Sequence, residues 1–151
     1  GMAVRTLNEE WKVSKIKFNG SCLCGAVRYE IKGDFQRFSH CHCQRCRKAT
    51  GTGHASNILV SPLSSLKWIS GESMLARYKV REAKRFYNCF CSQCGSPMPR
   101  EMAQLDAVLI PAGSTDSPLP ELPQNRIFWE SRALWSCDAG DLPVYSKYPE
   151  A

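Results

Sequence analysis

Nine cysteines stand out in this chain of 151 residues, because most of them recur at close and regular spacing. They form three groups and one single residue: Cys22 and Cys24; Cys41, Cys43 and Cys46; Cys89, Cys91 and Cys94; and Cys137. The first residues lack the apolar block of a secretory signal, so a cytoplasmic address is predicted, where thiols are kept reduced. Clustered reduced cysteines are typical of metal sites. The spacing therefore predicts metal binding.

The stretch Cys91-Ser92-Gln93-Cys94-Gly95 is typical of a tight metal-binding turn. Both sulfurs can face one ion, and Gly95 accommodates a left-handed backbone. Cys22 and Cys24 stand at the start of an expected strand, where alternate side chains share a face. These four cysteines are predicted to hold one zinc ion in a closed, structural site.

The remaining run, Cys41-x-Cys43-x-x-Cys46, supplies three thiols within one short segment. Three protein ligands with a vacant fourth position are what a catalytic zinc requires. The nearby residues that would close the site by supplying a fourth ligand are His40, His42, His54 and Cys89. Spacing alone favours neither the open nor the closed arrangement.

Short β-like runs separated by Gly, Pro and Ser dominate the rest of the chain and predict a mainly β fold. The expected strands are 15–19, 25–31, 37–40, 55–59, 75–80, 85–90 and 106–111, with 126–129 as one more candidate. Turns are expected at 33–34 and 70–72, and a surface loop at 112–124. Helical signal is confined to 44–49 and a weak stretch at 8–13.

Length and composition predict one domain over residues 1–151, with Gly1 as a cloning remnant. No apolar run approaches the roughly 18 residues needed to span a bilayer. The formal charge of +6 falls to about +3 if seven thiolates bind two zinc ions. Because Lys and Arg are scattered, the sequence gives little support for nucleic-acid binding.

Three segments together resemble the glutathione-dependent formaldehyde-activating enzyme family, which includes the centromere protein V relatives. The segments are 20–29 (GSCLCGAVRY), 41–51 (CHCQRCRKATG) and 90–96 (FCSQCGS). The resemblance implies a β-tent-like (Mss4-like) sheet assembly in which two zinc ions join distant segments of the chain. It assigns Cys22, Cys24, Cys91 and Cys94 to a structural zinc, and Cys41, Cys43 and Cys46 to an active-site zinc.

The resemblance also implies carbon–sulfur lyase chemistry, in which formaldehyde and glutathione join as S-hydroxymethylglutathione or the adduct is split. The expected partner is a small thiol or thiol–aldehyde adduct, whose sulfur an open zinc position would hold as thiolate. Arg45, Arg47 and Lys48 would then meet substrate carboxylates, or form only a solvated basic face. The alternative is a non-catalytic, zinc-stabilised binding module, as the centromere-related branch suggests.

Five further residues complete the set of candidates. His54 follows a Gly-rich loop and is either a proton carrier or an ordinary polar loop residue. His42 lies between two expected ligands and is interpreted as a packing or surface histidine. Arg126 stands where the resemblance implies a histidine at the wall of the substrate pocket, which places glutathione itself in question. Cys89 and Cys137 are interpreted as free, buried thiols.

Overall fold

The computed structural model describes residues 14–136 and 142–149, which include nine strands and one short α-helix. The strands are β1 (Lys15–Ser21), β2 (Arg28–Cys41), β3 (Ala55–Ser61), β4 (Leu66–Ser70), β5 (Leu75–Lys79), β6 (Tyr87–Cys91), β7 (Arg100–Met102), β8 (Ala107–Pro111) and β9 (Asn125–Ile127). The helix is α2 (Gln44–Thr50). Single 3₁₀ turns lie at Leu63–Ser65, Glu72–Met74, Ala103–Leu105, Ala112–Ser114 and Trp129–Ser131. The predicted mainly β fold is confirmed.

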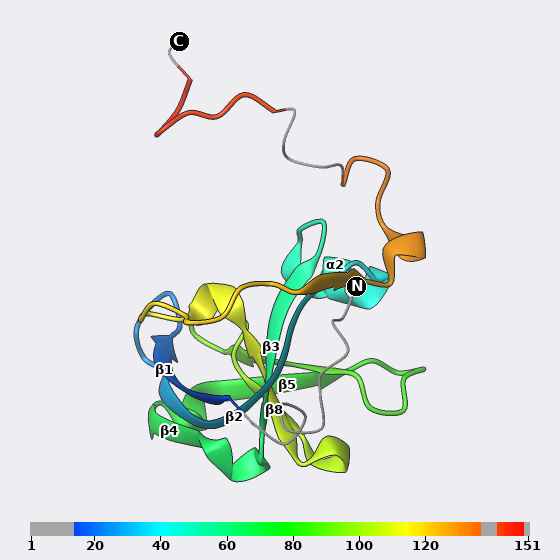
Figure 1. Ribbon diagram of the computed structural model, residues 1–151. Helices are drawn as coiled ribbons and strands as arrows, with labels where there is room; N and C mark the ends of the chain where they lie inside the picture. The colour runs from blue at the N-terminus through cyan, green and yellow to red at the C-terminus, as the bar shows by residue number, and fades with distance from the viewer. Residues whose placement is uncertain (1–13, 137–141, 150–151) are drawn as a thin grey trace, which may run out of the picture.

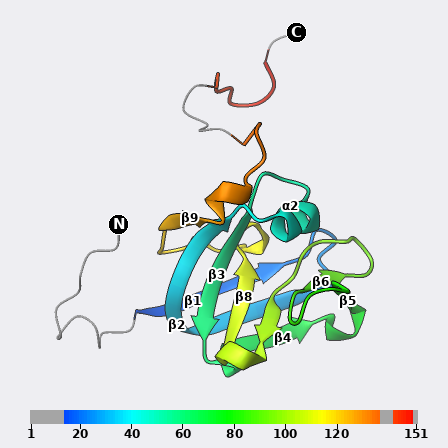
Figure 2. The same ribbon diagram turned by 90° about the vertical axis from the view of Figure 1, so that its right-hand side faces the viewer.

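Strand β2 organises the larger sheet, because it pairs with four other strands along its length. Its first half pairs with β1 and β4, and its second half pairs with β3 and β9. The register shifts between Phe35 and Arg37, where a bulge allows the strand to bend. The sheet continues from β3 to β8 and β7. Figures 1 and 2 show β2, β3 and β8 side by side, with α2 beyond one end of them.

Strands β5 and β6 form a separate antiparallel hairpin. The core is formed by apolar side chains of both sheets, and its most deeply buried members include Val27, Tyr29, Ile31, Ile58, Val60, Cys91, Met98, Val108 and Ile110. Strand β1 alternates exposed and buried residues, as expected of an edge strand with one face on the core, whereas β8 is buried along most of its length.

The ends of α2 explain why so short a helix forms. The Cys43 sulfur caps the first turn by accepting a hydrogen bond from the backbone N–H of Cys46 at 3.4 Å. Gly51 ends the helix in the left-handed region, with φ of 74°, and its N–H donates to the Arg47 carbonyl. Arg47 and Lys48 lie in the last turn, where cations complement the helix dipole. The predicted helical segment is thereby confirmed.

Several expectations about local structure were wrong. No turn forms at 33–34, because β2 runs straight through these residues while pairing with β1. The segment around Cys22 and Cys24 is a turn rather than a strand, so these cysteines meet through the turn and not through strand alternation. Strands β4 and β7 were not expected at all. The stretch 8–13 and Cys137 lie outside the described residues.

The expected loop at 112–124 contains a single 3₁₀ turn and is fastened to the sheet. Asp116 donates its backbone N–H to the Asn19 carbonyl at 2.9 Å and accepts from the Ser21 hydroxyl at 2.6 Å. The buried Tyr29 hydroxyl pairs with Ser114 at 2.5 Å. These contacts hold the loop beside β1.

The turn between β4 and β5 provides a test of the fold. Gly71 has φ of 75°, and a Cβ placed there would overlap the Ala26 carbonyl. Gly71→Ala should therefore lower the free energy of unfolding by about 2 kcal/mol or more, measured by denaturant titration. Gly113→Ala is the matched control, because its Cβ would meet open space at ordinary backbone angles. Equal effects of the two changes would contradict the turn geometry.

Candidate functional site

Two clusters of cysteines could hold metal ions, and the first joins two distant parts of the chain. Its members are Cys22, Cys24, Cys91 and Cys94, whose sulfurs all lie within 4.8 Å of one another. One pair comes from the turn after β1, and the other comes from the end of β6 and the turn that follows it. A bound ion would tie the hairpin to the larger sheet.

The geometry of this cluster fits a tetrahedral ion. The sulfurs of Cys22 and Cys24 are 3.6 Å apart, and those of Cys24 and Cys91 are 3.9 Å apart. Metal–sulfur bonds of about 2.3 Å in a tetrahedron require roughly 3.8 Å between sulfurs. The backbone N–H of Val27 donates to the Cys22 sulfur at 3.2 Å. Hydrogen bonds from the Ser96 side chain and backbone lower the pKa of Cys94 to about 5. These contacts favour thiolates.

The second cluster, Cys41, Cys43 and Cys46, forms at the junction of β2 and α2, again with sulfurs within 4.8 Å. Cys41 ends β2, Cys43 caps the helix, and Cys46 lies on its buried side. A hydrogen bond from Cys46 lowers the pKa of Cys41 to about 6, while the same contact raises the pKa of Cys46. One thiolate thus disfavours a second beside it, so all three ionise together only around a cation.

None of the four candidate fourth ligands joins this second cluster in the described part of the chain. The three histidines gather instead with one another: the rings of His40 and His54 are 4.1 Å apart, and those of His42 and His54 are 5.2 Å apart. His42 is fully buried and accepts a hydrogen bond at Nε2 from Arg126 at 3.2 Å. Cys89 is buried in the apolar core. The three-cysteine cluster keeps an open position among these residues.

A cavity of about 530 Å³, the cysteine pocket, opens onto this cluster. Its cations are Arg37, Arg45 and Arg100, and the lining residues within 14–136 and 142–149 include neither a carboxylate nor a histidine. Its apolar lining consists of Phe86, Met102, Leu109, Ile127 and Phe128. Its neutral polar lining consists of Ser39, Gln44, Asn57 and Ser131. The pocket therefore suits a ligand that combines a sulfur, an apolar part and negative charge.

Arg100 is a pocket residue that the cysteine pattern did not reveal. Its Nη1 donates to the Tyr87 carbonyl at 2.8 Å, and its guanidinium lies 4.7 Å from the centre of the Phe86 ring. Burial lowers the pKa of Arg100, while the nearby Cys46 raises it. It lies on β7, a strand that the sequence patterns did not predict. This fixed cation beside the thiols offsets their charge.

The other predicted substrate contacts are distributed over two pockets. Arg45 lines the cysteine pocket and also an adjoining pocket, which Lys48 lines as well. Arg47 lines neither of them, and its Nε donates to the His42 carbonyl at 3.4 Å. His54 lies outside the cysteine pocket and lines a third, hydroxyl-rich cavity.

Arg126 lies on the histidine side of β9, whereas its neighbours Ile127 and Phe128 line the cysteine pocket. Arg126 itself is absent from the lining of that pocket. The region thus contributes to the pocket wall through Ile127 and Phe128 but not through Arg126, because adjacent residues of a strand point to opposite faces. The replacement of histidine by arginine at this position does not alter the charge inside the cysteine pocket.

The model of the family described as glutathione-dependent formaldehyde-activating enzyme matches residues 17–131, and this chain belongs to that family. A crystal structure of a Rhodobacter sphaeroides protein, a structural genomics target, is also similar. It shares 24% sequence identity, with a TM-score of 0.54, over 70% of this chain and 97% of the other. At this identity the similarity shows the fold. None of the helices in residues 14–136 and 142–149 has the length and apolar character needed to cross a membrane.

The two clusters should respond differently to loss of one sulfur. Cys94→Ser should lose one metal ion and lower the free energy of unfolding by several kcal/mol, because its cluster ties the hairpin to the sheet. Cys43→Ser should lose one ion while the fold is retained. Elemental analysis and thermal unfolding of the purified proteins measure both effects.

Cys89→Ser is the matched control, because Cys89 is buried but belongs to neither cluster. It should keep the full metal content even where it costs stability. Loss of metal from this control, or unfolding of Cys43→Ser, would contradict the assignment of the clusters.

Proposed function

We propose that this protein is a zinc-dependent carbon–sulfur lyase that forms or splits an adduct of formaldehyde and an anionic thiol such as glutathione. The observation that carries the proposal is the open three-cysteine cluster at a pocket whose charged lining, among the residues that the structure describes, is cationic. Membership in the family supports the same type of reaction. The proposal treats residues 1–151 as a single domain that works in the cytoplasm.

Zinc is the metal we propose for both clusters. Thiolates favour zinc over the hard cations that prefer oxygen ligands, and the sulfur separations within the four-cysteine cluster suit its tetrahedral geometry. The four-cysteine cluster is then structural and the three-cysteine cluster catalytic. A zinc ion held by Cys41, Cys43 and Cys46 would supply a Lewis-acidic fourth position that favours the thiolate form of an incoming thiol.

The surrounding residues bind and orient the substrate. Arg37 and Arg45 are exposed at the pocket and are free to meet carboxylates, whereas Arg100 is fixed by Tyr87 and Phe86. Ile127 and Leu109 contribute an apolar wall that limits the access of water. Glutathione carries two carboxylates and one ammonium group, so its net charge complements this lining.

The reaction balances without an oxidant or reductant. In the forward direction the thiol sulfur forms a bond with the formaldehyde carbon, and the proton lost from the thiol ends on the former carbonyl oxygen. Because the described part of the lining offers no carboxylate or histidine, we infer that water carries this proton. His54 lies outside the pocket, so a direct proton transfer from it is not part of this proposal.

The proposal is tested by NMR exchange spectroscopy on mixtures of formaldehyde and glutathione. The zinc-loaded protein should accelerate exchange between free thiol and hydroxymethyl adduct, and Cys43→Ser should abolish the acceleration. Arg100→Gln should lower kcat/KM about tenfold or more, because it removes the fixed cation that offsets the negative charge of the nearby thiolates.

Two further variants make the result specific. Arg100→Lys keeps the charge and should retain part of the activity, while Lys84→Gln, an exposed residue outside both pockets, should match the unaltered protein. A protein loaded with both zinc ions that neither binds a thiol nor changes the exchange rate would refute the lyase proposal. The non-catalytic binding module would then be the better interpretation.

A further inference from the structure

A second cavity of about 600 Å³, the hairpin pocket, adjoins the cysteine pocket. The two cavities share three lining residues, Gln44, Arg45 and Phe86. They are therefore neighbouring parts of one concave surface rather than unrelated hollows. A ligand whose sulfur lies at the three-cysteine cluster can extend past Arg45 into the hairpin pocket.

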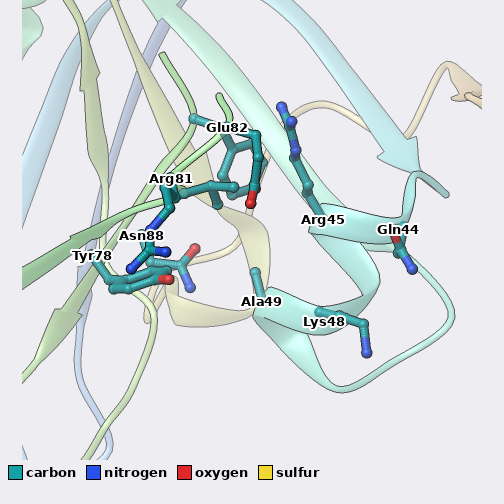
Figure 3. Close-up of a pocket in the computed structure, with 10 residues that line it drawn as sticks. Gln44, Arg45, Lys48, Ala49, Tyr78, Arg81, Glu82 and Asn88 are labelled. Carbon is teal, nitrogen blue, oxygen red and sulfur yellow. The ribbon is translucent and has the colours of Figure 1, made fainter. Parts of the chain in front are cut away.

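Helix α2 forms one wall of the hairpin pocket, and the β5–β6 hairpin forms the other (Figure 3). Arg45, Lys48 and Ala49 occupy neighbouring positions on one helix face, because residues three and four apart in sequence lie together. The buried Cys46 lies on the other side of the same helix. The helix thus presents Cys46 to the cysteine pocket, and Arg45 and Lys48 to the hairpin pocket.

The opposite wall supplies the groups that would recognise an anion. Arg81 lies there with the phenol of Tyr78 and the amide of Asn88, and Figure 3 shows these three on the hairpin side. Tyr78 is 61% exposed, so its ring is not buried in the hydrophobic core and can contact a ligand. Lys48 lies at the rim, and its amine is turned away from the hairpin (Figure 3).

The hairpin pocket has a positive balance of charge. Its described lining includes three cations, Arg45, Lys48 and Arg81, and one carboxylate, that of Glu82. None of these four residues forms a salt bridge within the described part of the chain. The guanidinium groups of Arg45 and Arg81 are therefore available for a ligand, and guanidinium groups bind carboxylate and phosphate strongly.

We propose that the hairpin pocket is a second subsite, which selects thiols carrying an anionic group several bonds away from the sulfur. This inference rests on the proposed function, which places the sulfur in the cysteine pocket. The distal anion is a carboxylate or a phosphate, and Arg81 is the residue that determines the preference. Short thiols without such a group would occupy only the cysteine pocket.

Thioether analogues test the subsite independently of catalysis, because a methylated sulfur forms no thiolate. Isothermal titration calorimetry on the zinc-loaded protein compares S-methylglutathione, the ethyl ester of its glycine carboxylate, and S-methyl-4′-phosphopantetheine. Arg81→Glu should weaken binding of S-methylglutathione or of the phosphopantetheine thioether about tenfold or more, and leave binding of the ester unchanged. The ligand that responds more strongly identifies carboxylate or phosphate as the preferred anion.

Lys84→Glu is the matched control, since it makes the same charge change in the same loop without lining the pocket. It should leave every affinity unchanged. Equal effects of Arg81→Glu and Lys84→Glu, or an equal loss for the ester and the free acid, would overturn the subsite. Circular dichroism establishes that each variant is folded.

Failure of the two proposals can be distinguished. If the protein does not accelerate thiol–formaldehyde exchange but the thioethers still bind in a way that depends on Arg81, the lyase proposal is wrong and the anion subsite stands. If exchange is accelerated equally for glutathione and cysteine, and Arg81→Glu changes neither rate, the lyase proposal stands and the subsite is wrong.

Discussion

Repulsion among clustered thiolates is the constraint on which this structure depends. Seven sulfurs lie in two groups, each with its members within 4.8 Å of one another. The opposed pKa shifts of Cys41 and Cys46 show that ionising one sulfur disfavours ionising its neighbour. A cation among the sulfurs would remove that conflict, and in the first cluster it would also fasten the β5–β6 hairpin to the larger sheet. Metal binding at that cluster would therefore be coupled to folding.

The same constraint explains how the two clusters differ. The four-cysteine cluster draws its ligands from the turn after β1 and from the end of β6 with the turn that follows, so four protein sulfurs are available to one ion. The three-cysteine cluster draws its ligands from one strand end and the helix that follows, and local geometry limits how many sulfurs such a junction presents. The histidines that might have completed it are engaged with one another and with Arg126. The remaining position faces the cysteine pocket.

Sequence spacing predicted the cysteine clusters because ligand spacing is local and specific. It also predicted α2 and most of the strands, whose signals are equally local. It did not predict that β2 runs unbroken through Gly33, since a strand that pairs on both sides overrides the turn preference of a Gly-Asp pair. Nor did it find Arg100, which reaches the site because β7 pairs with the neighbouring β8 and β8 pairs with β3, a strand much earlier in the chain. The lining of a pocket depends on such long-range pairing, and spacing carries no signal for it.

These contacts separate the end of the site that holds the cysteines from the end that would select the substrate. The sulfur-binding end of the site is built by β2 and α2, which hold Cys41, Cys43 and Cys46. The far end is formed by the β5–β6 hairpin, where Tyr78 and Arg81 are exposed and are not part of the hydrophobic core. Substitutions in the hairpin can therefore change which thiol is accepted without disturbing the cysteines. Arg126, by contrast, lies behind the pocket, so its departure from the family pattern leaves the thiol site intact. Under the proposed function, the choice of substrate would then be set across the pocket from the three cysteines, on the hairpin rather than on β9.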